Sequence, residues 1–143
     1  MRSAVAADHE RLRELTFESK AYWGYDRDFV RRWADGLAFE SGQERWVAED
    51  GGAIVAWAAL VPPGADGAAE LEDLWVDPAA LGRGLGRRLF LIAADRAREL
   101  GARQLRWEAE PKAVGFYEHM GAETVGTATS AWGRTLPVMR VVL

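Results

Sequence analysis

The stretch that decides the fold is LWVDP at Leu74–Pro78, followed by GRGLGRRL at Gly82–Leu89. It predicts a strand that runs into a glycine-rich turn, which in turn opens a helix. Glycines let the backbone approach a ligand closely, and the N–H groups at a helix start point toward one spot. The helix dipole and the arginines Arg83, Arg87 and Arg88 add positive potential there. The stretch therefore predicts a phosphate-binding turn, although an ordinary turn with solvated arginines would have the same composition.

Two other phosphate-binding motifs are excluded by their spacing. A Walker loop needs Gly, four residues and then Gly-Lys-Ser/Thr, and this string does not occur in the chain. A dinucleotide site needs Gly-x-Gly-x-x-Gly in an early strand-helix-strand unit. The run Gly82–Gly86 has a different spacing and lies in the middle of the chain.

The hydrophobic periodicity outward from this turn predicts an α/β fold with a mixed sheet. Helices are expected over about Asp8–Lys20, with Asp8 as the N-cap, over Asp26 to about Gly36, over Arg87–Leu100 and over Ala113–Met120. Strands are expected over Arg45–Glu49, Ala53–Val61, Ala69–Val76, Gln104–Trp107, Thr124–Ala128 and Leu136–Leu143. The turn Asp50–Gly52 is typical of a hairpin that joins the first two strands.

The composition limits the classes of function. The 143 residues fit a single domain over 1–143, and 49% hydrophobic with 28% charged residues is typical of a globular protein. Without cysteine, the chain has no disulfides, thiolate metal sites or cysteine nucleophiles, and we expect no metal. The net charge of −4 argues against nucleic acid as a partner. The sequence shows no leader and no run of about 20 apolar residues, so we expect no membrane partner and a cytoplasmic protein.

Two stretches of the chain, the glycine-rich turn and a later segment, resemble the conserved segments of the GNAT superfamily of acetyltransferases. The turn resembles their acetyl-CoA signature, Arg/Gln-x-x-Gly-x-Gly/Ala, and Pro111–Ala122 resembles their segment Asn-x-x-Ala-x-x-Phe-Tyr-x-x-x-Gly-Phe. The chain departs from these patterns at Leu81, where Arg or Gln is usual, and at Glu110, where Asn is usual. Ser19–Tyr25 and Gly133–Pro137 also resemble a bacterial subgroup, so the similarity covers nearly the whole chain.

This resemblance implies a mixed, mostly antiparallel central sheet flanked by helices, with acetyl-CoA (coenzyme A) as the cofactor. The implied activity is N-acetyl transfer by direct aminolysis to a primary amine of a small molecule or peptide. The amides of the glycine turn would hold the pyrophosphate, and the preceding strand would pair with the pantetheine arm. The implied cofactor-binding residues are Leu74, Trp75, Val76, Gly82, Arg83, Gly84, Leu85, Gly86, Arg87 and Phe116.

The resemblance also implies the catalytic and acceptor-binding residues. Tyr117 matches the acid that protonates the departing thiolate, although it could equally be a packed aromatic residue. Glu70 and Glu72 share one face of their strand and are both candidates for the general base. His119 lies two positions beyond Tyr117, so it faces away and is expected at the surface, as is His9. Trp23 and Tyr25 lie in a connection that borders the acceptor site in the family, and they could line that site or only fix the loop.

Two alternatives to an acetyltransferase stay open on the sequence alone. Leu81 and Glu110 favour a non-catalytic acyl-CoA-binding or regulatory module with the same fold. A hydrolase is disfavoured, because the chain has no Gly-x-Ser-x-Gly string and no cysteine. Whether the domain forms a homodimer, and which amine it accepts, stays undecided.

Overall fold

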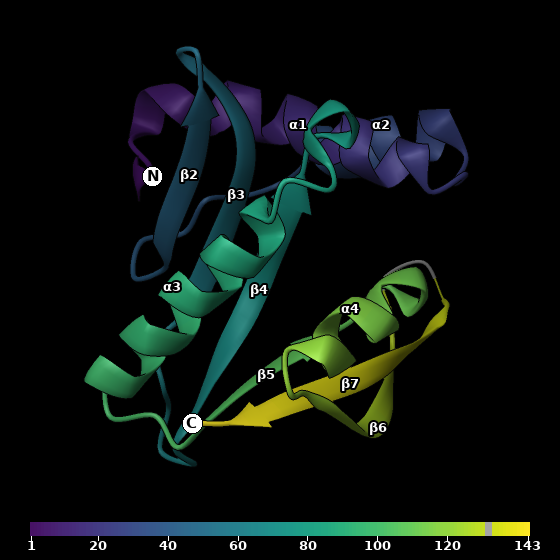
Figure 1. Cartoon of the computed structure of the whole chain (residues 1–143). Helices are drawn as coiled ribbons and strands as arrows, with labels where there is room; N and C mark the ends of the chain where they lie inside the picture. The colour runs from purple at the N-terminus through teal and green to yellow at the C-terminus, as the bar shows by residue number, and fades with distance from the viewer. Residues whose placement is uncertain (131–132) are drawn as a thin grey trace. The chain divides into compact units, whose positions relative to one another are not determined.

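The structure, a computed structural model, describes residues 1–130 and 133–143, so Trp132 lies outside the described residues. The strands have the order β1-β2-β3-β4-β5-β7-β6 in one mixed sheet (Figure 1). The recorded pairings of β1 with β2, β5 with β7 and β6 with β7 are antiparallel, and β4 pairs with β5 in parallel. The predicted α/β class with a mostly antiparallel sheet is confirmed.

The predicted helices and strands are present with small shifts of their ends. The helices are α1 His9–Tyr22, α2 Arg27–Asp35, α3 Leu85–Glu99 and α4 Val114–His119, with 3₁₀ turns η1 Ala6–Asp8, η2 Pro78–Ala80 and η3 Pro111–Ala113. The strands are β1 Arg2–Ser3, β2 Glu44–Asp50, β3 Ala53–Val61, β4 Ala68–Val76, β5 Gln104–Glu108, β6 Glu123–Thr129 and β7 Thr135–Val142. The short strand β1 has no counterpart among the predictions.

The chain divides into two compact units. The first unit comprises Met1–Ala59 and Asp73–Ile92, and the second comprises Leu60–Glu72 and Ala93–Leu143. The first unit holds α1, α2, β2 and the glycine-rich turn. The second holds β5, α4, β6 and β7.

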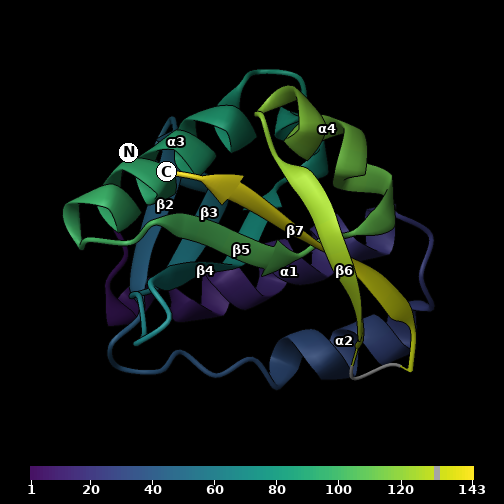
Figure 2. The same cartoon turned by 90° about the horizontal axis from the view of Figure 1, so that it is seen from below.

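Alternating side chains of β2, β3 and β4 build two apolar layers in the first unit. Leu12 and Leu15 of α1 pack with Val47 and Trp57 on one face. On the opposite face, Leu89 of α3 packs with the alternate residues of the strands, among them Ala48, Ala56 and Ala58. Figure 2 shows α1 and the first part of α3 on opposite sides of β2 and β3. This two-layer packing holds the start of α3, and therefore the turn that precedes it.

The predicted hairpin between β2 and β3 is confirmed. Gly51 and Gly52 have φ values of +60° and +86°, the left-handed backbone that a tight hairpin turn requires. The predicted start of the second helix is confirmed as well: Asp26 is its N-cap, and its carboxylate accepts a hydrogen bond from the Phe29 N–H at 3.0 Å.

Asp8 lies at the N-cap position of α1 as predicted, but its side chain makes no capping hydrogen bond to the helix. The Asp8 carboxylate accepts hydrogen bonds from the Arg2 guanidinium at 2.8 and 3.0 Å and from the Val5 N–H at 2.8 Å. These contacts fix the turn before α1 and hold the pKa of Asp8 down at about 2. The helix starts at His9, which is partly buried and stacks on Phe39 at 4.1 Å, so the expected surface position of His9 is wrong.

The second unit is built on β5, which has strand neighbours on both sides. Ala68, Ala69 and Glu70 of β4 pair in parallel with Gln104, Leu105 and Arg106. On the other side β5 pairs with β7, and β7 pairs with β6 through a register shift between Thr124 and Gly126. Leu105, Trp107 and Met139 are buried in the core of this unit. Among the helices of the described residues, none has the length and apolar character needed to cross a bilayer.

Candidate functional site

The glycine-rich turn places a set of backbone N–H groups at the start of α3. The helix begins at Leu85, two residues before the predicted start, and its first hydrogen bond runs from the Arg88 N–H to the Gly84 carbonyl at 3.1 Å. The N–H groups of Leu85, Gly86 and Arg87 precede that bond and have no acceptor within the helix. They form the kind of donor set that binds an anion.

Gly82 and Gly84 are required by their backbone conformation. Their φ values are +81° and +76°, a region that residues with a side chain rarely adopt. A Cβ added to either glycine would meet no atom of the described residues within 4 Å. The space above the turn is therefore open to a ligand that approaches the backbone closely.

One of the three arginines of the turn, Arg83, is engaged in an ion pair. The Arg83 guanidinium donates to the Asp50 carboxylate in the β2–β3 turn at 2.6 Å, and both side chains are more than half exposed. Arg87 and Arg88 are also exposed. Leu81 reaches solvent and is 45% exposed, so the donor set of the turn is made by backbone groups and does not need a side chain at that position.

A partly buried ion pair anchors the chain just before the turn. Arg11 of α1 donates to the Ile54 carbonyl at 3.0 and 3.2 Å and to the Asp77 carboxylate at 3.1 Å. Asp77 also accepts from the Ala79 N–H at 2.9 Å, and its own N–H donates to the Val55 carbonyl at 2.8 Å. Sequence reasoning missed this anchor, because Arg11 and Asp77 lie 66 positions apart in the sequence and leave no local signal.

The end of β4 presents different residues to the two layers of the first unit. Leu74 and Val76 pack with the cluster around Leu89, whereas Trp75 packs with the cluster around Trp57. The Trp75 indole N–H donates to the Asp73 carboxylate at 3.0 Å, which fixes the orientation of the ring.

Aromatic residues gather around Lys20 at the end of α1. The Lys20 ammonium lies 4.5 Å from the centre of the Tyr25 ring and 5.8 Å from that of Trp75, and Trp33 contacts Trp75 edge-on at 5.8 Å. Trp23, the other residue predicted to line the acceptor site, contacts Tyr22 edge-on at 5.6 Å. The structure thus joins Tyr25 and Trp75, which were predicted for different roles, through a lysine that the sequence analysis did not select.

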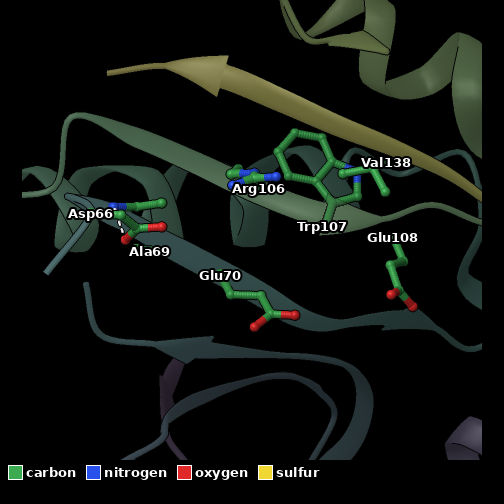
Figure 3. Close-up of a pocket in the computed structure, with 8 residues that line it drawn as sticks. Asp66, Ala69, Glu70, Arg106, Trp107, Glu108 and Val138 are labelled. Carbon is green, nitrogen blue, oxygen red and sulfur yellow. Dashed lines mark hydrogen bonds between the residues drawn. The ribbon is translucent and has the colours of Figure 1, made fainter. Parts of the chain in front are cut away.

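The second unit contains a polar pocket along β4 and β5, with a volume of about 280 Å³ (Figure 3). Glu70 and Arg106 are registered partners in the parallel pair, and Glu108 follows on the same face of β5, while Trp107 projects to the other face. The pocket is lined by Asp66, Ala68, Ala69, Glu70, Arg106, Trp107, Glu108 and Val138. Arg106 and Glu108 were not predicted, because the strand register cannot be read from the sequence.

The environment of Glu70 differs from that of an ordinary exposed carboxylate. Its side chain reaches solvent, but partial desolvation raises its pKa, and repulsion from Glu72 and Glu108 raises it further. Arg106 lowers the pKa, but to a smaller extent. A carboxylate with a raised pKa is a better proton acceptor, and these surroundings favour Glu70 as a candidate base.

Tyr117 lies in the core of the second unit and is 8% exposed. Its ring packs against Trp107 with the ring centres 4.9 Å apart and against Phe116 at 5.1 Å. Burial raises the pKa of Tyr117 far above its ordinary value, so the phenol keeps its proton at all physiological pH values. Phe116 is exposed, and His119 is exposed as predicted.

The comparison with known proteins assigns the chain to a family. A sequence profile described as the acetyltransferase (GNAT) family matches residues 9–122, which include both the glycine-rich turn and α4. The chain belongs to this family. The membership predicted from the two conserved segments is therefore confirmed, and so is the acyltransferase class of enzymes to which GNAT proteins belong.

Similar proteins place the chain within the GNAT family without naming its acceptor. The chain is 31% identical over 99 residues to the Uncharacterized N-acetyltransferase YjgM of Escherichia coli (strain K12); the match covers 66% of this chain and 59% of that relative. A GCN5-related N-acetyltransferase from Kribbella flavida is 26% identical with a TM-score of 0.75, covering 99% of this chain and 96% of that one. The PaiA N-acetyltransferase from Thermoplasma acidophilum, solved with coenzyme A, is 16% identical with a TM-score of 0.79, covering 99% and 97%. This last likeness supports the GNAT fold.

Proposed function

We propose that the protein transfers an acetyl group from acetyl-CoA to a primary amine of a small molecule or peptide. The observation that carries the proposal is the turn before α3, where two left-handed glycines leave open space and the N–H groups of Leu85, Gly86 and Arg87 have no acceptor within the helix. These groups fit a diphosphate, which needs several N–H donors and close backbone approach.

In this proposal the cofactor is held mainly by backbone groups. The turn amides from Gly82 to Arg87 would bind the pyrophosphate, with added charge from the arginines. The extended backbone of Leu74–Val76 would pair with the pantetheine amides as a further strand does. Phe116 would contribute an exposed aromatic surface to the same ligand. Acetyl-CoA supplies the activated acetyl thioester.

The reaction would be a direct aminolysis. The amine nitrogen forms a bond to the thioester carbonyl carbon, the carbon–sulfur bond breaks, and coenzyme A leaves as a thiolate. Glu70, whose pKa is raised, would accept the proton that the attacking ammonium must lose, and Glu72 is the second candidate. Tyr117, whose phenol stays protonated, would donate a proton to the thiolate, and the second proton that the nitrogen loses as the amide forms would restore the phenol. Tyr25 and Trp23 would contact the acceptor.

Thiol release from acetyl-CoA tests this function directly. The purified protein is mixed with acetyl-CoA alone and then with amines, aminoglycosides, amino acids and peptides with free N-termini. Release that depends on one of these amines is the expected result. Release without any amine would indicate a hydrolase, and coenzyme A binding without release would indicate the binding module that Leu81 and Glu110 favour.

A further inference from the structure

The Lys20 ammonium already occupies an aromatic surface in the first unit. It lies within the distance at which a cation is attracted by ring faces, at 4.5 Å from the Tyr25 centre and 5.8 Å from the Trp75 centre. Asp73 holds the Trp75 indole by its N–H, and Trp33 supports the same ring edge-on. The Trp75 ring is thus held in place by groups other than the lysine.

The type of cation at this position is unusual for the chain. Lysine and arginine together number 18, and only Lys20 and Lys112 are lysines. Guanidinium groups stack on other rings, as where Arg31 lies over Phe17 at 3.8 Å and Arg45 over Phe39 at 5.1 Å. The rings of Tyr25 and Trp75 instead face the compact ammonium of Lys20.

We propose that Tyr25 and Trp75 form an ammonium-binding site in which Lys20 is an internal competitor. A cationic amine would bind the same ring faces after the Lys20 side chain has moved away. The flexible stem of the lysine allows this movement, and the Trp75 ring keeps its contacts with Asp73 and Trp33. The assignment of that amine as the acetyl acceptor rests on the proposed function, and it narrows the acceptor to amines that carry a positive charge on arrival.

The test uses tetramethylammonium, a cation that cannot be acetylated and forms no hydrogen bonds. Its binding is followed at constant ionic strength through the indole N–H signal of Trp75 in ¹⁵N–¹H spectra, assigned by its loss in Trp75→Phe. Lys20→Met removes the charge but keeps the apolar stem, whereas Lys20→Arg keeps a cation. Lys112→Met removes the other lysine and serves as the matched control.

The expected result is that Lys20→Met binds tetramethylammonium about three- to fivefold more tightly than the wild type, which corresponds to one exposed cation–aromatic contact. Lys20→Arg and Lys112→Met should match the wild type. In the Lys20→Met background, Tyr25→Phe should keep the gain and Tyr25→Leu should remove it, with circular dichroism as the check of folding.

Equal affinity in Lys20→Met and the wild type, or a gain that survives Tyr25→Leu in a folded protein, would overturn the proposal. Because the probe is unreactive, the outcome is independent of whether the protein transfers acetyl groups.

Discussion

Gly84 and Gly101 have the same left-handed backbone at opposite ends of α3, with φ values of +76° and +87° and open space where a Cβ would lie. Gly84→Val and Gly101→Val should each lose stability, by about 1–2 kcal/mol, because a side chain disfavours this conformation. Only Gly84→Val should lose coenzyme A binding, since its side chain also fills the space above the turn amides. Calorimetry of coenzyme A binding, with denaturant unfolding of both variants, measures the two effects. Normal affinity in Gly84→Val would contradict the phosphate-binding turn.

Tyr117 has a packing role that the structure shows and an acid role that we propose. Tyr117→Phe keeps the ring against Trp107, so the melting temperature should change little. If the phenol protonates the thiolate, turnover should fall by about 10- to 1,000-fold, in the range of one acid–base group, while cofactor affinity stays the same. Steady-state rates at saturating acetyl-CoA, together with calorimetry, separate these effects. Wild-type turnover would leave Tyr117 as a core residue.

Glu70 and Glu72 lie on one strand face, and Glu70 is partly desolvated and has two neighbouring carboxylates, Glu72 and Glu108. A base must be ionised, so the rate should fall as the pH drops through the raised pKa of Glu70. Glu70→Gln should remove this acidic limb, and its residual rate should rise at high pH, where the amine loses its proton unaided. Glu72→Gln is the matched control: it should keep the limb but move it to lower pH, because the repulsion from Glu72 that raises the pKa of Glu70 is removed. Two variants with wild-type pH–rate profiles would indicate that neither carboxylate is the base.

Secondary-structure elements are joined by a buried polar pair as well as by apolar layers. The Trp57 indole N–H of β3 donates to the Thr16 hydroxyl of α1 at 3.0 Å, and that hydroxyl donates to the Leu12 carbonyl at 2.7 Å. Both residues are almost completely buried. Thr16→Val should lower the free energy of unfolding by about 1–3 kcal/mol, because it leaves the indole N–H without this acceptor. Thr16→Ser keeps the hydroxyl and should be closer in stability to the wild type. Urea unfolding of the two variants gives the comparison, and equal stabilities would contradict it.

Elements with local signals were predictable, and their exact ends were not. Gly51 and Gly52 define the hairpin, and Asp26 defines the start of α2, through chemistry that adjacent residues contain. The helix α3 starts two residues before the predicted Arg87, because Gly86 belongs to both the glycine-rich motif and the first turn of the helix. The Asp8 side chain does not cap α1 for a different reason. Its carboxylate pairs with Arg2, which lies on a strand too short to show a sequence pattern.

At the scale of the whole molecule, the sequence predicted the family and the glycine-rich turn from continuous motifs, and the mixed sheet from hydrophobic periodicity. It could not predict which residues meet across the fold. The Arg11–Asp77 anchor, the surroundings of Glu70 and the contact of Lys20 with Trp75 all depend on strand register or on the packing of helices. The candidate base and the ammonium site therefore became distinguishable only in three dimensions.

Each compact unit contains a deeply buried indole, Trp57 in the first and Trp107 in the second, at 1% and 3% exposure. With 5-fluorotryptophan incorporated, these two rings are fluorine NMR reporters that each observe one unit alone, once Trp57→Phe and Trp107→Phe have assigned their resonances. If residues 1–143 fold as a single domain, both resonances should lose their native intensity at the same urea concentration. Separate midpoints would mean that one unit can unfold while the other stays native, so the chain would have an equilibrium state in which only half of its residues are ordered.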